Sequence, residues 1–185
     1  PAIADIAAAA GTEQDTACFS LDIEASCRLG AGEGAPSFVL WGDSHAKSLV
    51  PGFDSLAREA GLHGVGFGGV GCTPFPGIRI VEIPGDCAEN NERIVQSLVE
   101  SPSIRTVVIA ARWALYAEGG SYPPEQPTRI RLRDSQGSTE SAAGNLDVLA
   151  RGLRRMCERL TAAGKTVILV GPVPEIGYDV PATVA

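Results

Sequence analysis

The apolar positions of the chain fall into two patterns that alternate from residue 38 onward. Short, continuous apolar runs predict buried strands, and longer segments with apolar residues three or four positions apart predict amphipathic helices. The predicted strands cover residues 38–42, 63–67, 105–111 and 165–170, and the predicted helices cover 46–60, 88–100 and 141–163. This alternation is typical of an α/β domain with a parallel sheet and right-handed crossovers.

The helical pattern also predicts which side chains face the core. In the first helix these are Leu49, Phe53, Leu56 and Ala60, and in the last they are Leu146, Leu149, Leu153, Met156 and Leu160. The connection at 113–140 has little periodicity, although residues 128–133 alternate and predict one arm of a hairpin that turns at 134–137. Residues 1–37 are expected to form an irregular N-terminal segment.

Composition and charge limit the classes of partner. The 185 residues suit one domain with a substantial core, and the net charge of −7 argues against binding to nucleic acid or to anionic lipid. No run of about 20 apolar residues is present, so the sequence predicts no membrane span. The single methionine, Met156, is internal, and we therefore expect the chain to be a domain of a longer protein.

Five cysteines allow two interpretations. Cys18 and Cys27 are close in sequence, Cys72 and Cys87 flank a segment rich in proline and glycine, and Cys157 lies on a predicted helix. Cys-x-x-Cys pairs and suitably spaced histidines are missing from the sequence, so we expect no metal site. Two local disulfides with one buried free thiol would indicate an oxidising compartment, whereas five unpaired thiols would indicate the cytosol.

The segment that begins at Phe38 carries the most informative chemistry. An apolar strand is followed by Gly42, which permits tight backbone geometry, and by Asp43 and Ser44, which are favourable helix N-cap residues. A serine between a parallel strand and a helix lies where α/β sheets bind ligands, and the helix N-terminus favours developing negative charge. Ser44 is therefore a candidate nucleophile, although helix capping alone would also explain the pattern.

The residues around this turn resemble a known family. The run Trp41-Gly42-Asp43-Ser44-His45-Ala46, with Pro51 in the following helix, resembles the first sequence block of the SGNH hydrolase superfamily. It is most similar to the extracytoplasmic SGNH domains fused to membrane acyltransferases of the acyltransferase-three family, which O-acylate bacterial surface glycans. The resemblance implies a flavodoxin-like three-layer α/β/α sandwich over residues 38–185, with a mainly parallel sheet in the strand order 2-1-3-4.

The resemblance also implies how an oxyanion would be stabilised. Ser44 is the expected nucleophile, and its own backbone N–H is one expected donor. A second donor is expected in the loop after the second strand, where Gly69 and Gly71 offer N–H groups, although these glycines also fit a role limited to forming the turn. The other residues of the first block are expected to support the turn: Gly42, Asp43 and His45.

The third block departs from most of the superfamily, which places an Asn after the third strand. This chain has Arg112-Trp113 there, similar to the Ala-Arg-Trp block of the acyltransferase-linked domains. Arg112 would stabilise an oxyanion or bind an acceptor, or would simply pair with a surface carboxylate. Trp113 and Tyr116 would stack on a sugar, or would cover the edge of the sheet.

The general base is the main gap. The superfamily's last block, Asp-x-x-His, does not occur in the sequence, and the two histidines are His45 and His63. His45 directly follows Ser44 and is poorly placed as a base, and His63 begins the second strand at its wrong end, so that we expect it to be structural. We expect the C-terminal block with the Asp and His to lie beyond Ala185.

The resemblance implies O-acyl transfer, with acetyl as the expected acyl group, to a bacterial surface glycan through a serine acyl-enzyme. A carbohydrate O-acetyl esterase and a non-catalytic glycan-binding module remain open alternatives. The implied partners are a glycan, an acyl donor and a fused membrane acyltransferase domain, with no cofactor, metal or nucleic acid. Related domains carry cysteine pairs around the same segments, which favours Cys18–Cys27 and Cys72–Cys87 disulfides and a periplasmic or outer-face location.

Overall fold

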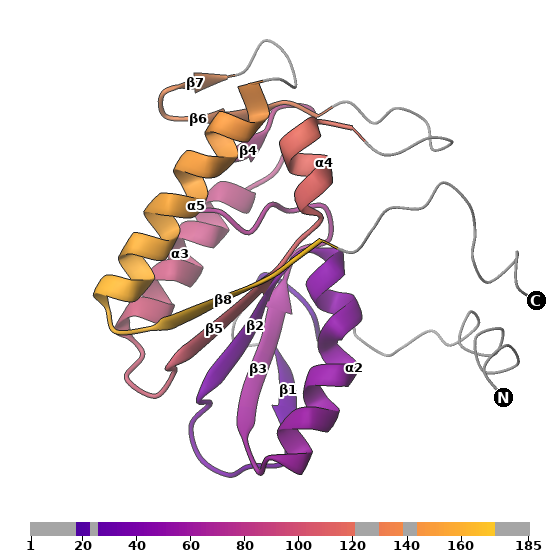
Figure 1. The fold of residues 1–185 in the computed structure, drawn as a ribbon, viewed down its shortest axis with the longest axis vertical. Helices are drawn as coiled ribbons and strands as arrows, with labels where there is room; N and C mark the ends of the chain where they lie inside the picture. Colours follow the sequence, from indigo (N-terminus) through magenta and orange to yellow (C-terminus); the bar gives the residue numbers. More distant parts are fainter. Residues whose placement is uncertain (1–17, 23–25, 121–129, 139–143, 173–185) are drawn as a thin grey trace, which may run out of the picture.

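A computed structural model of the chain describes residues 18–22, 26–120, 130–138 and 144–172. In these ranges, a five-stranded sheet lies between helices, and a smaller three-stranded sheet lies beyond the end of the layers (Figure 1). None of the helices in these ranges is long and apolar enough to cross a membrane.

The main sheet has the strand order β1-β3-β2-β5-β8. Its strands are β1 (Cys27–Gly30), β2 (Phe38–Gly42), β3 (His63–Gly68), β5 (Thr106–Ala110) and β8 (Thr166–Val170). β3, β2, β5 and β8 are parallel and confirm the predicted order 2-1-3-4, whereas β1 pairs antiparallel with β3. β1 shows that the expectation of an irregular segment over residues 1–37 is wrong at residues 27–30. The sequence did not reveal this strand because four residues are too few to show an alternating pattern.

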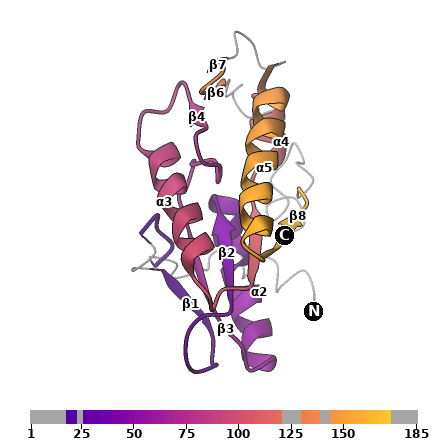
Figure 2. The same ribbon diagram turned by 90° about the vertical axis from the view of Figure 1, so that its left-hand side faces the viewer.

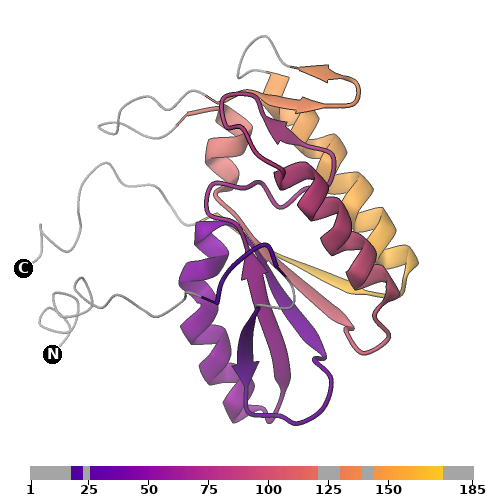
Figure 3. The same ribbon diagram turned by 180° about the vertical axis from the view of Figure 1, so that it is seen from behind.

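Helices cover both faces of the main sheet. α2 (Ser44–Glu59) lies on one face, and α3 (Cys87–Glu100) and α5 (Asn145–Ala162) lie on the other (Figures 1, 2 and 3). All three were predicted from the sequence. α4 (Trp113–Glu118) lies in the predicted connection at 113–140 and was missed, because six residues are too few to display helical periodicity.

The central strands are buried on both faces, as their continuous apolar runs predict. Val39 and Trp41 belong to the core under α3 and α5, whereas Leu40 belongs to the second core under α2. Each of these three side chains is 0% exposed. β2 therefore packs against the helices on both faces of the sheet. This packing fixes the position of Asp43 and Ser44, which directly follow the strand.

Three predicted core positions are wrong, because Leu56, Ala60 and Leu146 are exposed. Leu56 of α2 is 63% exposed, because the buried positions of this helix are Ala46, Val50 and Ala57. Leu56 instead lines an open apolar hollow of about 620 Å³ beside β5. Leu146 is 58% exposed, because it lies in the first turn of α5, which projects beyond the main sheet (Figure 1).

The smaller sheet has the order β4-β6-β7 and is antiparallel. It consists of β4 (Arg79–Ile80), β6 (Leu132–Asp134) and β7 (Gly137–Ser138). β6 and β7 form the hairpin that the alternation at 128–133 predicts, and its turn falls within the predicted residues 134–137. This sheet lies at the end of α5 that is remote from β8 (Figure 1).

A buried carboxylate fastens this hairpin to α5. The Asp134 side chain is 0% exposed, and its Oδ2 lies 3.1 Å from Arg151 Nε and 3.6 Å from Arg155 Nη1. Its Oδ1 accepts the backbone N–H of Gln136 at 2.9 Å. Burial opposes the charge, but the hydrogen bonds from Arg151 and Gln136 and the nearby guanidinium groups hold the pKa of Asp134 below its ordinary value of 3.8.

Asp134→Asn should therefore make the protein less stable at pH 7 and less sensitive to acid. A carboxyl whose pKa is lowered by folding stabilises the protein above the unfolded pKa, and this contribution is lost as pH falls through the folded pKa. We expect the variant to lose about 2 kcal/mol at pH 7 and a smaller amount at about pH 3, which lies below the ordinary pKa of the carboxyl. Urea unfolding at both pH values measures this, and an equal loss at both would contradict it.

Candidate active site

The parallel strands bring several candidate residues to one edge of the main sheet. Gly42 at the end of β2 is in register with Gly68 of β3 on one side and with Ala110 of β5 on the other. Ala110 is in turn in register with Val170 of β8. The segments that contain Ser44, Gly71 and Arg112 therefore all leave the sheet at its C-terminal edge, where α/β folds bind ligands.

Ser44 is the first residue of α2 and is half-buried. Asp43 is the N-cap of the helix, and its carboxylate accepts the backbone N–H of His45 at 2.8 Å. The N–H groups of a first helical turn have no acceptor within the helix, so the Ser44 N–H points out of the helix end. A serine hydroxyl thus sits at the positive end of a 16-residue helix.

Asp43 does more than cap α2. It is 1% exposed, and its Oδ2 accepts the backbone N–H of Arg112 at 2.9 Å and the hydroxyl of Tyr116 at 2.7 Å. Both carboxylate oxygens are thus engaged by the protein. These contacts are consistent with the supporting role expected for Asp43, which stays a prediction.

The glycines after β3 form a turn. The Cys72 N–H donates to the Gly69 carbonyl at 2.9 Å, and Gly71, inside this turn, has a φ of +73°. A left-handed φ favours glycine, so Gly71 is explained by the turn itself. Gly71 is also exposed. Its role as an oxyanion donor stays a prediction, as does that of Gly69.

Arg112 lies directly between β5 and α4 and is half-buried. Its backbone N–H is used by Asp43, so the guanidinium is the part of this residue that could meet an oxyanion or an acceptor. The positive charge lies close enough to Tyr116 to oppose part of the rise in that residue's pKa. The Arg112 backbone is therefore bound to the Asp43 turn, and the role of its side chain stays a prediction.

The two aromatic residues expected to stack on a sugar, or else to cover the edge of the sheet, both have contacts within the protein. Tyr116 is 1% exposed, so the prediction that it stacks on a sugar is wrong for this structure; its hydroxyl serves Asp43 instead. Trp113 is half-buried, donates its Nε1–H to the Val170 carbonyl at 2.7 Å and packs against Phe75 with ring centroids 5.8 Å apart. Trp113 thus covers the end of β8, and sugar stacking by its open part stays a prediction.

The two histidines lie at opposite edges of the sheet. His45 follows Ser44 in the first turn of α2 and is half-buried. His63 begins β3, where its Nδ1 lies 2.6 Å from the Gly34 carbonyl and its Nε2 lies 3.0 Å from Arg28 Nη1. These contacts agree with a structural role for His63, far from the edge that carries Ser44.

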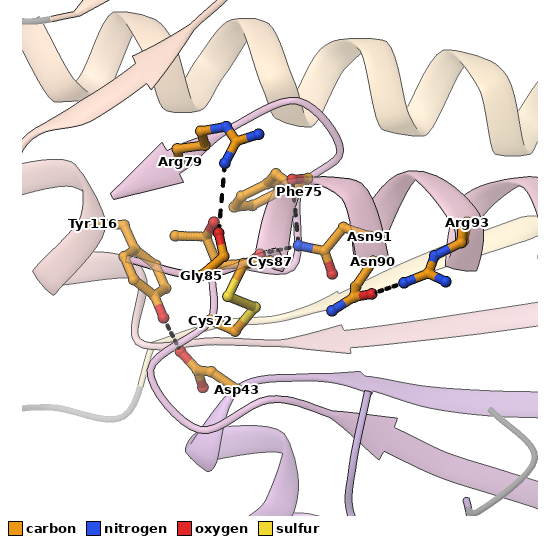
Figure 4. The surroundings of a disulfide bond; sticks show 11 residues. Asp43, Cys72, Phe75, Arg79, Gly85, Cys87, Asn90, Asn91, Arg93 and Tyr116 are labelled. Atoms are coloured by element: carbon orange, nitrogen blue, oxygen red, sulfur yellow. Dashed lines mark hydrogen bonds between the residues drawn. A yellow bond between two sulfur atoms is a disulfide. The ribbon is translucent and has the colours of Figure 1, made fainter. Parts of the chain in front are cut away.

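Both expected disulfides are present. Cys18 pairs with Cys27 and Cys72 pairs with Cys87, which leaves Cys157 free. Cys157 is half-buried rather than fully buried, and burial raises the pKa of its thiol. Figure 4 shows that Asp43 and Tyr116 are among the residues that surround the Cys72–Cys87 disulfide, which ties the Gly69–Cys72 turn to the first residue of α3.

Removing the Cys72–Cys87 disulfide should destabilise the protein. Cys72 and Cys87 are 15 residues apart, and a cross-link of that span stabilises by about 3 kcal/mol. We expect the Cys72→Ala, Cys87→Ala double variant to lose about this amount in chemical unfolding. Cys157→Ala is the matched control and should cost at most about 1 kcal/mol. Equal losses in both variants would argue against the disulfide.

Within the described ranges, no group of three or more His, Cys, Asp or Glu side chains is placed to hold a metal ion. The groups at this edge of the sheet are the Ser44 hydroxyl, backbone N–H groups, the Asp43 network and Arg112. These groups suit nucleophilic attack on a carbonyl and stabilisation of the resulting oxyanion.

Comparison with known proteins agrees with this geometry. The family model of the SGNH domain (fused to AT3 domains) matches residues 12–185. Searches of curated proteins and of solved structures gave no significant match. The family supports a function of hydrolase or acyltransferase type, and its fusion to AT3 domains, together with the two disulfides, indicates an extracytoplasmic domain. The chain belongs to the family of SGNH domains fused to AT3 domains.

Proposed function

We propose that Ser44 forms an acyl-enzyme and passes an O-acyl group, acetyl in the simplest case, to a hydroxyl of a bacterial surface glycan. The observation that carries this proposal is the position of Ser44, at the first residue of α2 and at the C-terminal edge of a parallel sheet. The buried Asp43 carboxylate holds the turn before it. Membership of a family fused to AT3 domains supports an acyl group as the cargo.

The reaction would consist of two attacks on a carbonyl carbon. The Ser44 Oγ first attacks the acyl donor while a base takes its proton, and the donor's leaving group departs with a proton as the ester with Ser44 forms. A glycan hydroxyl then attacks this ester, and the serine regains its proton. The base is expected from the Asp-x-x-His block that the family resemblance implies.

Negative charge develops on the carbonyl oxygen in both attacks. The Ser44 N–H and the N-terminus of α2 are the first groups proposed to stabilise it, because they are fixed by the Asp43 cap. The N–H of Gly71 or Gly69 and the Arg112 guanidinium are the proposed further donors. Arg112 would also suit a hydroxyl-rich or anionic acceptor, since a guanidinium donates several hydrogen bonds from one plane.

The cellular setting follows from the same proposal. A fused membrane acyltransferase would deliver the acyl group, and the Ser44 domain would act in the periplasm or at the outer face of the membrane. Two disulfides support an oxidising location. The glycan is the acceptor in this scheme, and water would compete with it for the acyl-enzyme.

Product analysis tests the proposal. The full-length protein is incubated with 4-nitrophenyl acetate and an excess of surface-glycan fragments, and both the sugars and free acetate are measured by mass spectrometry and chromatography. We expect acetylated sugar that depends on Ser44. Free acetate alone, at a rate independent of the sugar, would replace transfer by esterase activity, and sugar binding without turnover would leave a binding module.

A further inference from the structure

The Asp43 carboxylate joins two segments that are far apart in the chain. Its Oδ1 accepts the N–H of His45, in the helix that Asp43 caps, at 2.8 Å. Its Oδ2 accepts the Arg112 N–H at 2.9 Å and the Tyr116 hydroxyl at 2.7 Å, and both donors follow β5. Asp43 and Tyr116 are each 1% exposed, so bulk water cannot readily replace a lost donor.

We infer that Tyr116 is a positioning residue for Ser44: through the Asp43 carboxylate, its hydroxyl holds the nucleophile turn and the Arg112 backbone in one fixed arrangement. This rests on the proposed role of Ser44 as the nucleophile. It assigns Tyr116 to the inside of the site, where it acts on Ser44 through Asp43 and has no contact with substrate.

The hydroxyl, rather than the ring, is what this position requires. Capping α2 uses only Oδ1, and a phenylalanine ring would fill nearly the same buried volume as Tyr116. A carboxylate removed from water needs donors on both oxygens, and Tyr116 supplies one of the two on Oδ2. Figure 4 shows the Tyr116 side chain reaching from its helix to Asp43.

The Tyr116 hydroxyl also stays protonated, and so remains a hydrogen-bond donor. Burial, together with the charge and the hydrogen bond of Asp43, raises the pKa of Tyr116 far above its ordinary value of 10.0, against a smaller opposing effect of Arg112. The hydroxyl therefore keeps its proton across the neutral and alkaline range and continues to donate. Positioning by Tyr116 should not vary with pH in that range.

The first test replaces the hydroxyl alone. In the full-length protein, Tyr116→Phe should slow the reaction of Ser44 with a fluorophosphonate probe by about tenfold, because a donor to a buried charged group is lost. With 4-nitrophenyl acetate, kcat should fall by a similar factor, about tenfold, with KM unchanged. Exchange of the Arg112 backbone amide, followed by NMR, should become about tenfold faster, since its acceptor is then less firmly held.

Asp54→Asn is the matched control. Asp54 also accepts a backbone N–H from another element, that of Gly30, at 2.8 Å, but it lies toward the edge of the sheet where His63 begins β3. This variant should lose stability while the Ser44 rate and the Arg112 exchange stay unchanged. A loss of Ser44 reactivity equal to that of Tyr116→Phe would mean that general destabilisation, rather than positioning, explains the result.

A double-mutant cycle measures whether the effects of the Asp43 and Tyr116 substitutions on Ser44 reactivity depend on each other. A merely structural role of Tyr116 would not produce such a dependence. Asp43→Asn cannot accept on both sides, so it should slow Ser44 more than Tyr116→Phe does. If Tyr116 acts through Asp43, adding Tyr116→Phe to Asp43→Asn should cost less than about threefold more, instead of multiplying the two losses. Losses that multiply fully would overturn the inference.

The outcomes separate this inference from the proposed function. Unchanged Ser44 reactivity together with unchanged Arg112 exchange in Tyr116→Phe would overturn the positioning role while leaving Ser44 as the nucleophile. Failure of the unaltered protein to react with the probe at Ser44 would count against the nucleophile. In that case, faster Arg112 exchange would still support control of the turn by Tyr116, and unchanged exchange would refute it.

Discussion

Ser44→Ala should abolish turnover of 4-nitrophenyl acetate by the full-length protein. Without the hydroxyl there is no acyl-enzyme, and the remaining groups of such a site act poorly alone because nucleophile and base work as a unit. We expect kcat/KM to fall by roughly 10⁴-fold or more. The residual activity would come from the oxyanion donors. The folded state should be unaffected, since the half-buried side chain loses a single oxygen.

Ser48→Ala is the matched control for this prediction. Ser48 lies one turn further along α2, is exposed, and donates its hydroxyl to the Ser44 carbonyl at 2.9 Å. The same chemical change there should leave kcat/KM within about twofold of the unaltered protein, as expected for an exposed substitution. Ser44→Ala protein that keeps its activity would place the nucleophile elsewhere and would remove the basis of the proposed mechanism.

The parts of the fold that were predicted correctly share a local cause. The strand at Phe38 and the helix after Ser44 follow from a continuous apolar run, a glycine and an N-cap residue in direct succession. The parallel order follows from the alternation of such units along the chain. The hairpin at Asp134 was likewise predicted from alternating polar and apolar residues and a turn sequence a few residues later.

The parts that were missed depend on distant contacts. Tyr116 was expected to stack on a sugar or to cover the edge of the sheet, yet its hydroxyl bonds to Asp43, 73 residues away. The available signal was Asp43 itself, since a carboxylate directly after a buried strand needs donors from a neighbouring strand end. Leu56 has the right spacing for a core residue, but the sequence cannot show that α2 turns it toward an open hollow.

Gly42→Ala should strongly destabilise the fold around Ser44. A Cβ at position 42 would lie 1.8 Å from the Ala110 carbonyl oxygen and 2.8 Å from the Ala46 Cβ. The oxygen belongs to the backbone of β5, which is paired in register with β2, so it cannot move aside without breaking the ladder between the two strands. We expect a loss of about 3 kcal/mol or more in chemical unfolding, together with loss of Ser44 reactivity.

Gly52→Ala makes the same change where there is room for it, and its result should have the opposite sign. Gly52 is exposed within α2, and a Cβ there would meet nothing within 4 Å. Alanine in a helix is favoured over glycine by about 0.5–1 kcal/mol, so this variant should unfold at higher denaturant concentration. Comparing the two variants separates the effect of the space around each glycine from the effect of replacing glycine by alanine. If both variants were stabilised, the close approach of β2 and β5 at Gly42 could not be what fixes the turn that carries Ser44. The position of the nucleophile would then depend on the Asp43 hydrogen bonds alone.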